Sequence, residues 1–202
     1  METVLLQNRN IFASNCYILI SDGEFSVVDP SVSYKDAVDA IPRIADMRPK
    51  FVLLTHVHAD HFWEIHSYVD IGCKVLVSDL DSRAFSDRRV NCAELLGSSF
   101  SGYDGEFKTV SDGESIKFGT ETLSALLTPG HTLGSVSYYA DGVLFSGDTL
   151  FERGGYGRYD LPGGDASSLA QSLKRLLDLP GETVLYSGHG GITTIKETKQ
   201  FF

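Results

Sequence analysis

Short runs of β-prone residues recur along the whole chain, and only a few helical segments separate them. Asp-Gly pairs and other polar breaks end several of these runs, as is typical of strands joined by tight turns. Interleaved strand groups with few amphipathic helices indicate two sheets packed together with helices outside. We expect strands at 4–6, 16–20, 25–28, 51–54, 74–77, 107–110, 115–118, 122–127, 135–139, 143–146 and 183–186.

Three segments have apolar residues at helical spacing, namely 34–47, 62–69 and 166–177. The last is the clearest, because Asp165 can cap its start and its leucines fall on one face. We find no repeat, low-complexity tract or linker, and 202 residues fit one folding unit. The sequence therefore predicts one domain that spans residues 1–202.

Charge and composition exclude several classes of protein. The chain has 17 Lys and Arg against 27 Asp and Glu, a formal net charge of −10, so we expect no nucleic-acid partner. No apolar stretch is long enough to cross a bilayer, and no signal peptide is recognisable, so we expect a cytoplasmic protein without membrane contact. The three cysteines form no CxxC pair, which argues against a thiolate metal site.

Half of the histidines gather in one stretch: residues 55–61 read THVHADH, directly after the apolar run 51–54. Three other polar residues also follow expected strands and lie beside glycine, namely His131 in TPGHT, Asp148 in SGDT and His189 in SGHGG. The ends of neighbouring strands meet at one edge of a sheet, so these groups can converge. A polar loop that merely contains histidines would not account for the three distant stretches.

Imidazoles and carboxylates are ligands for zinc, iron or manganese. One zinc ion needs three or four protein ligands, and the sequence offers seven. That number fits two divalent metal ions that share a bridging carboxylate, a geometry used for hydrolysis. Zinc is the metal we expect first, with iron or manganese as alternatives. The candidate ligands are His56, His58, Asp60, His61, His131, Asp148 and His189.

The sequence resembles the metallo-β-lactamase superfamily, whose members carry HxHxDH, then a lone His, a bridging Asp and a final His in that order. The resemblance implies an αββα sandwich of two mixed sheets, with the site at one edge. It assigns His56, His58 and His131 to a first metal, Asp60, His61 and His189 to a second, and Asp148 to the bridge between them. It also implies that Asp29, in the stretch VVDP, orients a ligand rather than binding metal.

Within the superfamily, the block GDTLFERGGYGRYDLPGGD at 147–165 is similar to the glyoxalase II group, the hydroxyacylglutathione hydrolases. That likeness implies hydrolysis of a small thioester such as S-lactoylglutathione by a metal-bridging hydroxide, which Asp60 could orient. By position, Arg158 and Tyr159 would contact the substrate. Tyr156 replaces the usual cysteine, the aromatic after the last histidine is missing, and no C-terminal helical domain follows. Thioester hydrolysis is therefore better supported than glutathione specificity.

Other activities remain open at this stage. A persulfide dioxygenase shares the framework but uses one iron bound by the equivalents of His56, His131 and Asp148. A metallo-hydrolase of another ester or lactone is a further alternative, whereas seven intact ligands argue against a non-enzymatic scaffold. The commonest zinc β-lactamases place a cysteine at the position of Asp148, which disfavours antibiotic hydrolysis. The sequence does not indicate the oligomeric state, and His66, the one histidine outside the motifs, is expected at the surface.

Overall fold

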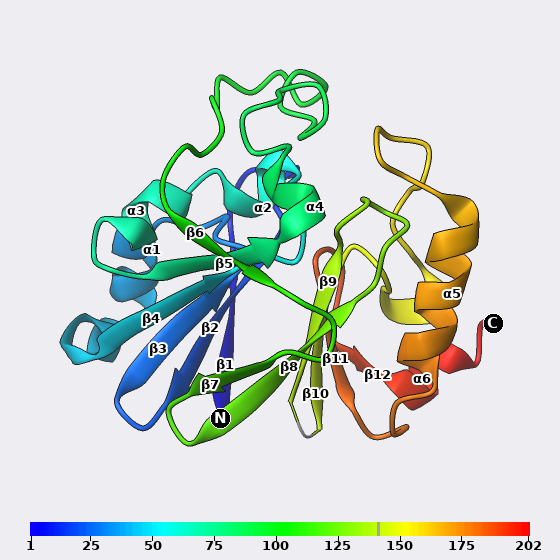
Figure 1. Cartoon of the computed structure of the whole chain (residues 1–202). Helices are drawn as coiled ribbons and strands as arrows, with labels where there is room; N and C mark the ends of the chain where they lie inside the picture. The colour runs from blue at the N-terminus through cyan, green and yellow to red at the C-terminus, as the bar shows by residue number, and fades with distance from the viewer. Residues whose placement is uncertain (141) are drawn as a thin grey trace.

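The computed structural model describes residues 1–140 and 142–202. It contains two six-stranded sheets packed face to face, with helices on their outer faces (Figure 1). Both sheets mix parallel and antiparallel neighbours. The αββα sandwich of two mixed sheets predicted from the sequence is therefore confirmed.

The first sheet runs in chain order from β1 to β6. β1 to β3 are antiparallel, and β3 to β6 are parallel. The β2–β3 turn is the Asp22-Gly23 pair, and both residues have positive φ, at 48° and 71°. This is the backbone that a tight two-residue hairpin requires. The strands are β1 (Glu2–Gln7), β2 (Asn15–Ser21), β3 (Glu24–Val28), β4 (Arg48–Leu53), β5 (Lys74–Ser78) and β6 (Phe107–Val110).

The second sheet has the order β12-β11-β10-β9-β8-β7. Only β10 and β11 are parallel, and the chain between them forms α5 (Ala166–Leu177) on the outer face. A parallel pair needs such a crossover, because the chain must return to the starting edge. The strands are β7 (Ser115–Phe118), β8 (Glu121–Leu127), β9 (Val136–Ala140), β10 (Val143–Gly147), β11 (Val184–Ser187) and β12 (Thr193–Thr194).

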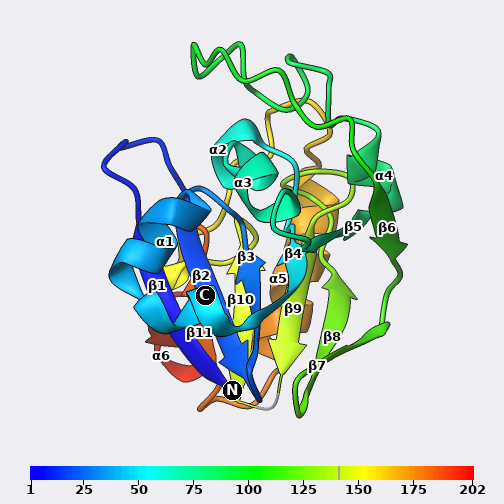
Figure 2. The ribbon, with the colours of Figure 1, turned by 90° about the vertical axis from the view of Figure 1, so that its left-hand side faces the viewer.

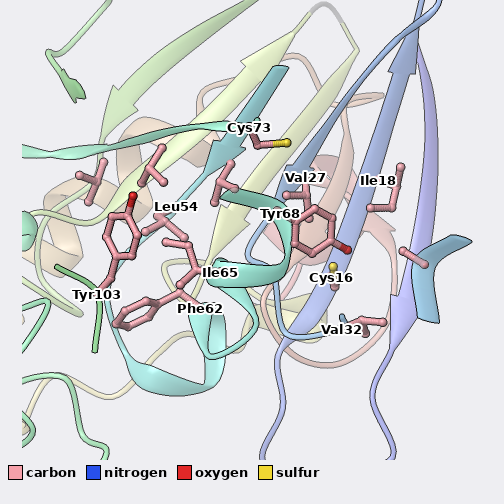
Figure 3. Close-up of a cluster of buried hydrophobic side chains, with 14 of the residues drawn as sticks. Cys16, Ile18, Val27, Val32, Leu54, Phe62, Ile65, Tyr68, Cys73 and Tyr103 are labelled. Carbon is pink, nitrogen blue, oxygen red and sulfur yellow. The ribbon is translucent and has the colours of Figure 1, made fainter. Parts of the chain in front are cut away.

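Three apolar clusters correspond to the three interfaces between layers. One lies between the sheets, and a second lies beneath α5. The third lies under the helices of the first sheet, where Tyr68 packs beside Cys16, Ile18 and Val27 (Figure 3). The remaining helices are α1 (Tyr34–Ala40), α2 (Ala59–Phe62), α3 (Ile65–Val69), α4 (Asp79–Ser82) and α6 (Ile195–Lys199), with 3-10 turns at Pro42–Asp46 and Glu152–Gly154.

Two predicted helices are broken in the structure. The segment 34–47 divides at Ile41 (φ −132°, ψ 74°), because Pro42 disfavours helical backbone in the residue before it. The segment 62–69 divides into α2 and α3, and α2 begins earlier, at Ala59 within the histidine motif. β12, α4 and α6 were not anticipated. No helix in the described part of the chain is long and apolar enough to cross a membrane.

Candidate metal centre

All seven predicted ligands lie at the carboxyl ends of strands, along one edge of the two sheets. His56 and His58 follow β4, and α2 carries Asp60 and His61. His131 follows β8, Asp148 follows β10 and His189 follows β11. Figure 1 shows α2 at this end of the sandwich, below the long green segment that joins α4 to β6. The structure thus brings together side chains that are up to 133 positions apart in sequence (His56 to His189).

Three imidazoles form the first group. The Nε2 atoms of His56 and His131 are 3.2 Å apart, and the Nδ1 atom of His58 is 3.1 Å from the first and 2.9 Å from the second. Nitrogens bound to one tetrahedral zinc at about 2.0–2.1 Å lie about 3.3 Å from each other. The three rings therefore have the spacing of ligands around a single metal ion.

The outer nitrogens of two of these rings decide which tautomer is present. His131 Nδ1 donates to the carbonyl oxygen of Arg158 at 2.7 Å. His56 Nδ1 donates to Thr55 Oγ1 at 3.1 Å, since the Thr55 hydroxyl itself donates to Asp29. In these tautomers the inner nitrogens of the two rings carry lone pairs that face each other, which a cation between them would stabilise.

Burial keeps the rings of His56 and His58 neutral. Desolvation and the neighbouring imidazoles lower the pKa of His56 well below its usual value and lower the pKa of His58 to about 3. A buried neutral imidazole is the form that binds a divalent metal. The donor set, its spacing and its protonation state therefore fit a metal ion.

Asp60, His61 and His189 form the second group. Asp60 Oδ2 lies 3.3 Å from His189 Nε2 and 3.7 Å from His61 Nε2. Although burial opposes ionisation, the two imidazoles lower the pKa of Asp60. The buried Nε2 of His61 makes no hydrogen bond to any described residue. Buried polar atoms normally have a partner, so this nitrogen is a candidate for binding a metal ion.

Asp148 lies between the two groups. Its Oδ1 is 3.3 Å from His61 Nε2, and its Oδ2 is 3.7 Å from both His131 Nε2 and His189 Nε2. Oδ1 also has no hydrogen-bond partner among the described residues. A carboxylate in this place can contact two cations at once. Gly188 makes room for it, because a Cβ there would lie 2.2 Å from Asp148 Oδ1.

Asp29 hydrogen-bonds to one candidate ligand, His61, and to Thr55, which agrees with the orienting role that the resemblance implied. One of its oxygens accepts from the Thr55 amide, and the other accepts from the Thr55 hydroxyl and from His61 Nδ1 at 2.9 Å. The bond to Nδ1 directs Nε2 of His61 towards the carboxylates. Asp29 follows β3 with φ 50°, so the chain turns sharply at this point.

Sequence reasoning missed two supporting carboxylates. Buried Asp81 accepts from the amides of Val57 and Gly134 and from the Thr132 hydroxyl, and so joins the loops of His56 and His131. Glu152 accepts from the Gly191 amide and holds the loop after His189. Neither residue carries a local signal, because every partner is distant in sequence. His66 is outside the ligand groups, and its ring lies 5.6 Å from that of Tyr103.

A cavity of about 330 Å³ opens over the candidate metal ligands. His58, Asp60, His131, Asp148 and His189 line its floor. Its walls are mostly apolar and come from Leu95, Leu96, Phe151, Tyr156 and Leu161. Of the two residues expected to contact substrate, Arg158 lines the cavity, whereas exposed Tyr159 is not among the lining residues that the structure describes.

All seven candidate ligands lie within the stretch of the chain that a family model matches. The model of the metallo-beta-lactamase superfamily matches residues 9–189. The chain belongs to this superfamily. Its members bind divalent metals, and the His/Asp groups described above are the matching candidates here.

Two curated relatives differ in how much of the chain they match. The probable metallo-hydrolase YqgX of Bacillus subtilis is 35% identical over 190 residues, covering 90% of this chain and 87% of that protein. The hydroxyacylglutathione hydrolase of Bartonella quintana is 56% identical over 78 residues, which are 38% of this chain and 30% of that protein. The likeness to a metallo-hydrolase therefore spans the chain, and the likeness to this hydroxyacylglutathione hydrolase is local.

Three solved structures have the same fold. BLEG-1, a B3 metallo-beta-lactamase, superposes with a TM-score of 0.90 at 32% identity, over 98% of this chain and 97% of that one. TTHA1623 in a di-iron-bound form gives 0.83 at 29% identity, over 100% and 98%. ETHE1 from Myxococcus xanthus gives 0.77 at 28% identity, over 100% and 83%.

Proposed function

We propose that this protein is a metal-dependent hydrolase of thioesters of the S-lactoylglutathione type. The observation that carries the proposal is the position of Asp148, which lies within 3.7 Å of imidazoles from both ligand groups. The local likeness of the Bartonella quintana hydroxyacylglutathione hydrolase supports the thioester class.

His56, His58 and His131 would hold one divalent cation, and Asp60, His61 and His189 a second, with Asp148 in contact with both. A divalent metal bound in this way polarises a carbonyl oxygen and brings the pKa of water from 15.7 to about 7. A second metal is in keeping with the di-iron-bound form of TTHA1623.

The chain's own residues position the reactants. Asp60 lines the cavity floor as a carboxylate, so one of its oxygens can accept a proton from the attacking water and fix its direction. Leu96, Phe151 and Leu161 displace solvent from the cavity, which strengthens the electrostatic interactions within it.

The leaving group explains why a thioester suits this site. Water adds its oxygen to the carbonyl carbon and the C–S bond breaks, which yields a carboxylate, a thiol and one proton. A thiolate, with a pKa of about 8.5, leaves without a strong proton donor. An amine is far more basic and would need one.

The test is a substrate panel run on the metal-loaded protein. We expect thiol release from S-lactoylglutathione or from simpler acyl thioesters, detected with a thiol reagent. Asp148→Asn should lose most of this turnover, about 100-fold or more, and keep its far-ultraviolet circular dichroism, because it removes the shared charge but not the volume. Turnover of the variant within a few-fold of the unmodified protein would contradict the role of Asp148.

Two further arms separate the alternatives. A β-lactam belongs in the panel because BLEG-1, a B3 metallo-beta-lactamase, is similar over nearly the whole chain. Glutathione persulfide with an oxygen electrode tests for a dioxygenase. Cleavage of the β-lactam alone, or oxygen uptake without thioester hydrolysis, would overturn the proposal.

A further inference from the structure

Arg158 is the one Lys or Arg side chain among the described residues that line the cavity. Its Nε and Nη2 donate to the two carboxylate oxygens of Asp160, both at 2.8 Å. This bidentate contact lowers the pKa of Asp160 to about 2, so both partners are charged at neutral pH. A ligand in the cavity therefore meets a neutral pair instead of a free cation.

The pair has little to do with fold stability. The side chains of Arg158 and Asp160 are 57% and 62% exposed, and exposed ion pairs contribute little to stability. Its main consequence is the charge that the cavity presents. The metal ions that Asp60 and Asp148 would hold offset the charge of these two carboxylates on the floor, whereas the whole chain is at −10. Beyond the metal ions, the long-range field of the chain thus gives an anionic ligand no attraction, and the guanidinium of Arg158 is already paired.

The cavity walls contain apolar side chains that are exposed to solvent. Leu95 is 65% exposed and Tyr156 is 47% exposed, yet both line the cavity. Leu95 lies on the long segment between α4 and β6, which crosses the end of the sandwich near α2 in Figure 2. Apolar surface that the fold leaves uncovered beside a reactive centre is typical of a site for an apolar group.

We propose that this cavity selects thioesters with an uncharged thiol part and an apolar acyl part, and that Asp160 enforces the selection by engaging the guanidinium of Arg158. The proposal rests on the thioester hydrolysis proposed above. Leu95 and Tyr156 would cover the acyl group. Asp160 is a positioning residue in this account, because it acts on the substrate through Arg158.

The first experiment varies one half of the substrate at a time on the metal-loaded protein. With the acyl group fixed, the thiol part is either glutathione, which adds a net charge of about −1, or neutral N-acetylcysteamine. With the thiol fixed, the acyl group is acetyl, lactoyl or phenylacetyl. We expect kcat/KM to be about tenfold higher for N-acetylcysteamine than for glutathione, and highest for phenylacetyl.

The second experiment frees the guanidinium. Asp160→Asn should raise the ratio of kcat/KM for the glutathione thioester over the N-acetylcysteamine thioester about two- to fivefold, since Arg158 then offers its donors to the substrate but the exposed pair withheld them only weakly. High salt should reduce this gain by screening. The matched control is Asp39→Asn, which removes an acid as exposed as Asp160 from its pair with Lys35, away from the cavity. This control should leave the ratio unchanged.

The third experiment tests the wall. Leu95→Ser should raise KM for the phenylacetyl thioester about three- to tenfold and change the acetyl thioester less. Leu80→Ser is the control, because Leu80 is similarly apolar and 47% exposed but does not line the cavity. Equal effects of both variants would contradict a wall role for Leu95.

The results keep the two proposals apart. Hydrolysis of no thioester would overturn the proposed function. Hydrolysis with a preference for glutathione, together with an unchanged substrate ratio in Asp160→Asn, would leave the proposed function standing and overturn this inference.

Discussion

The carboxylate of Asp29 accepts three hydrogen bonds and thereby fixes the orientation of the His61 ring. Asp29→Asn would offer one acceptor oxygen in place of two, so either the Thr55 amide or His61 Nδ1 would face an NH₂ group. Loss of such a supporting contact costs about 10- to 100-fold in metal affinity. We expect Asp29→Asn to show this loss of metal affinity when it competes with a coloured chelator for the metal in a titration.

Asp36→Asn is the control for this variant. Asp36 is an exposed acid in α1, and it is not part of any of the candidate ligand groups. It should leave metal affinity unchanged. If Asp29→Asn bound metal as tightly as this control, the orienting role of Asp29 would be wrong.

Helix α5 shows which parts of the fold could be predicted from sequence and why. Its leucines and its Asp165 cap lie within a dozen positions, so local spacing located it, and Asp165 accepts from the Ser168 amide as expected. The strand-end placement of the seven candidate ligands was also readable, since each follows an apolar run. Asp81 and Glu152 were not, because their partners Thr132 and Gly191 are 51 and 39 positions away. The role of these two carboxylates becomes visible only when the folded chain brings their partners into contact with them.

The packing of α5 leads to a stability prediction. Leu176 is fully buried between this helix and the second sheet. Leu176→Ala should lower the free energy of unfolding by about 2–5 kcal/mol through lost burial and the cavity left behind. Urea unfolding at a fixed metal concentration measures it, with exposed Gln171→Ala in the same helix as the control. Similar midpoints for the two variants would show that α5 contributes little to the core.

Across the molecule, the two sheets contribute different halves of one centre. The first sheet supplies His56, His58, Asp60 and His61, and the second supplies His131, Asp148 and His189. Hydrogen bonds between the halves fix their relative position, for example from Tyr17 and Asn15 of β2 to the Ser187 carbonyl oxygen of β11. Metal bound at the centre would join the sheets and stabilise the folded state by mass action.

The metal content of the purified protein tests this account most directly. Elemental analysis after exhaustive dialysis should give about two divalent metal ions per chain, because the ligands form two groups with Asp148 between them. The metal could be zinc, iron or manganese, since this mixture of nitrogen and oxygen ligands suits each. One iron per chain, with no second metal taken up on incubation with excess zinc, iron or manganese, would contradict the two-metal centre.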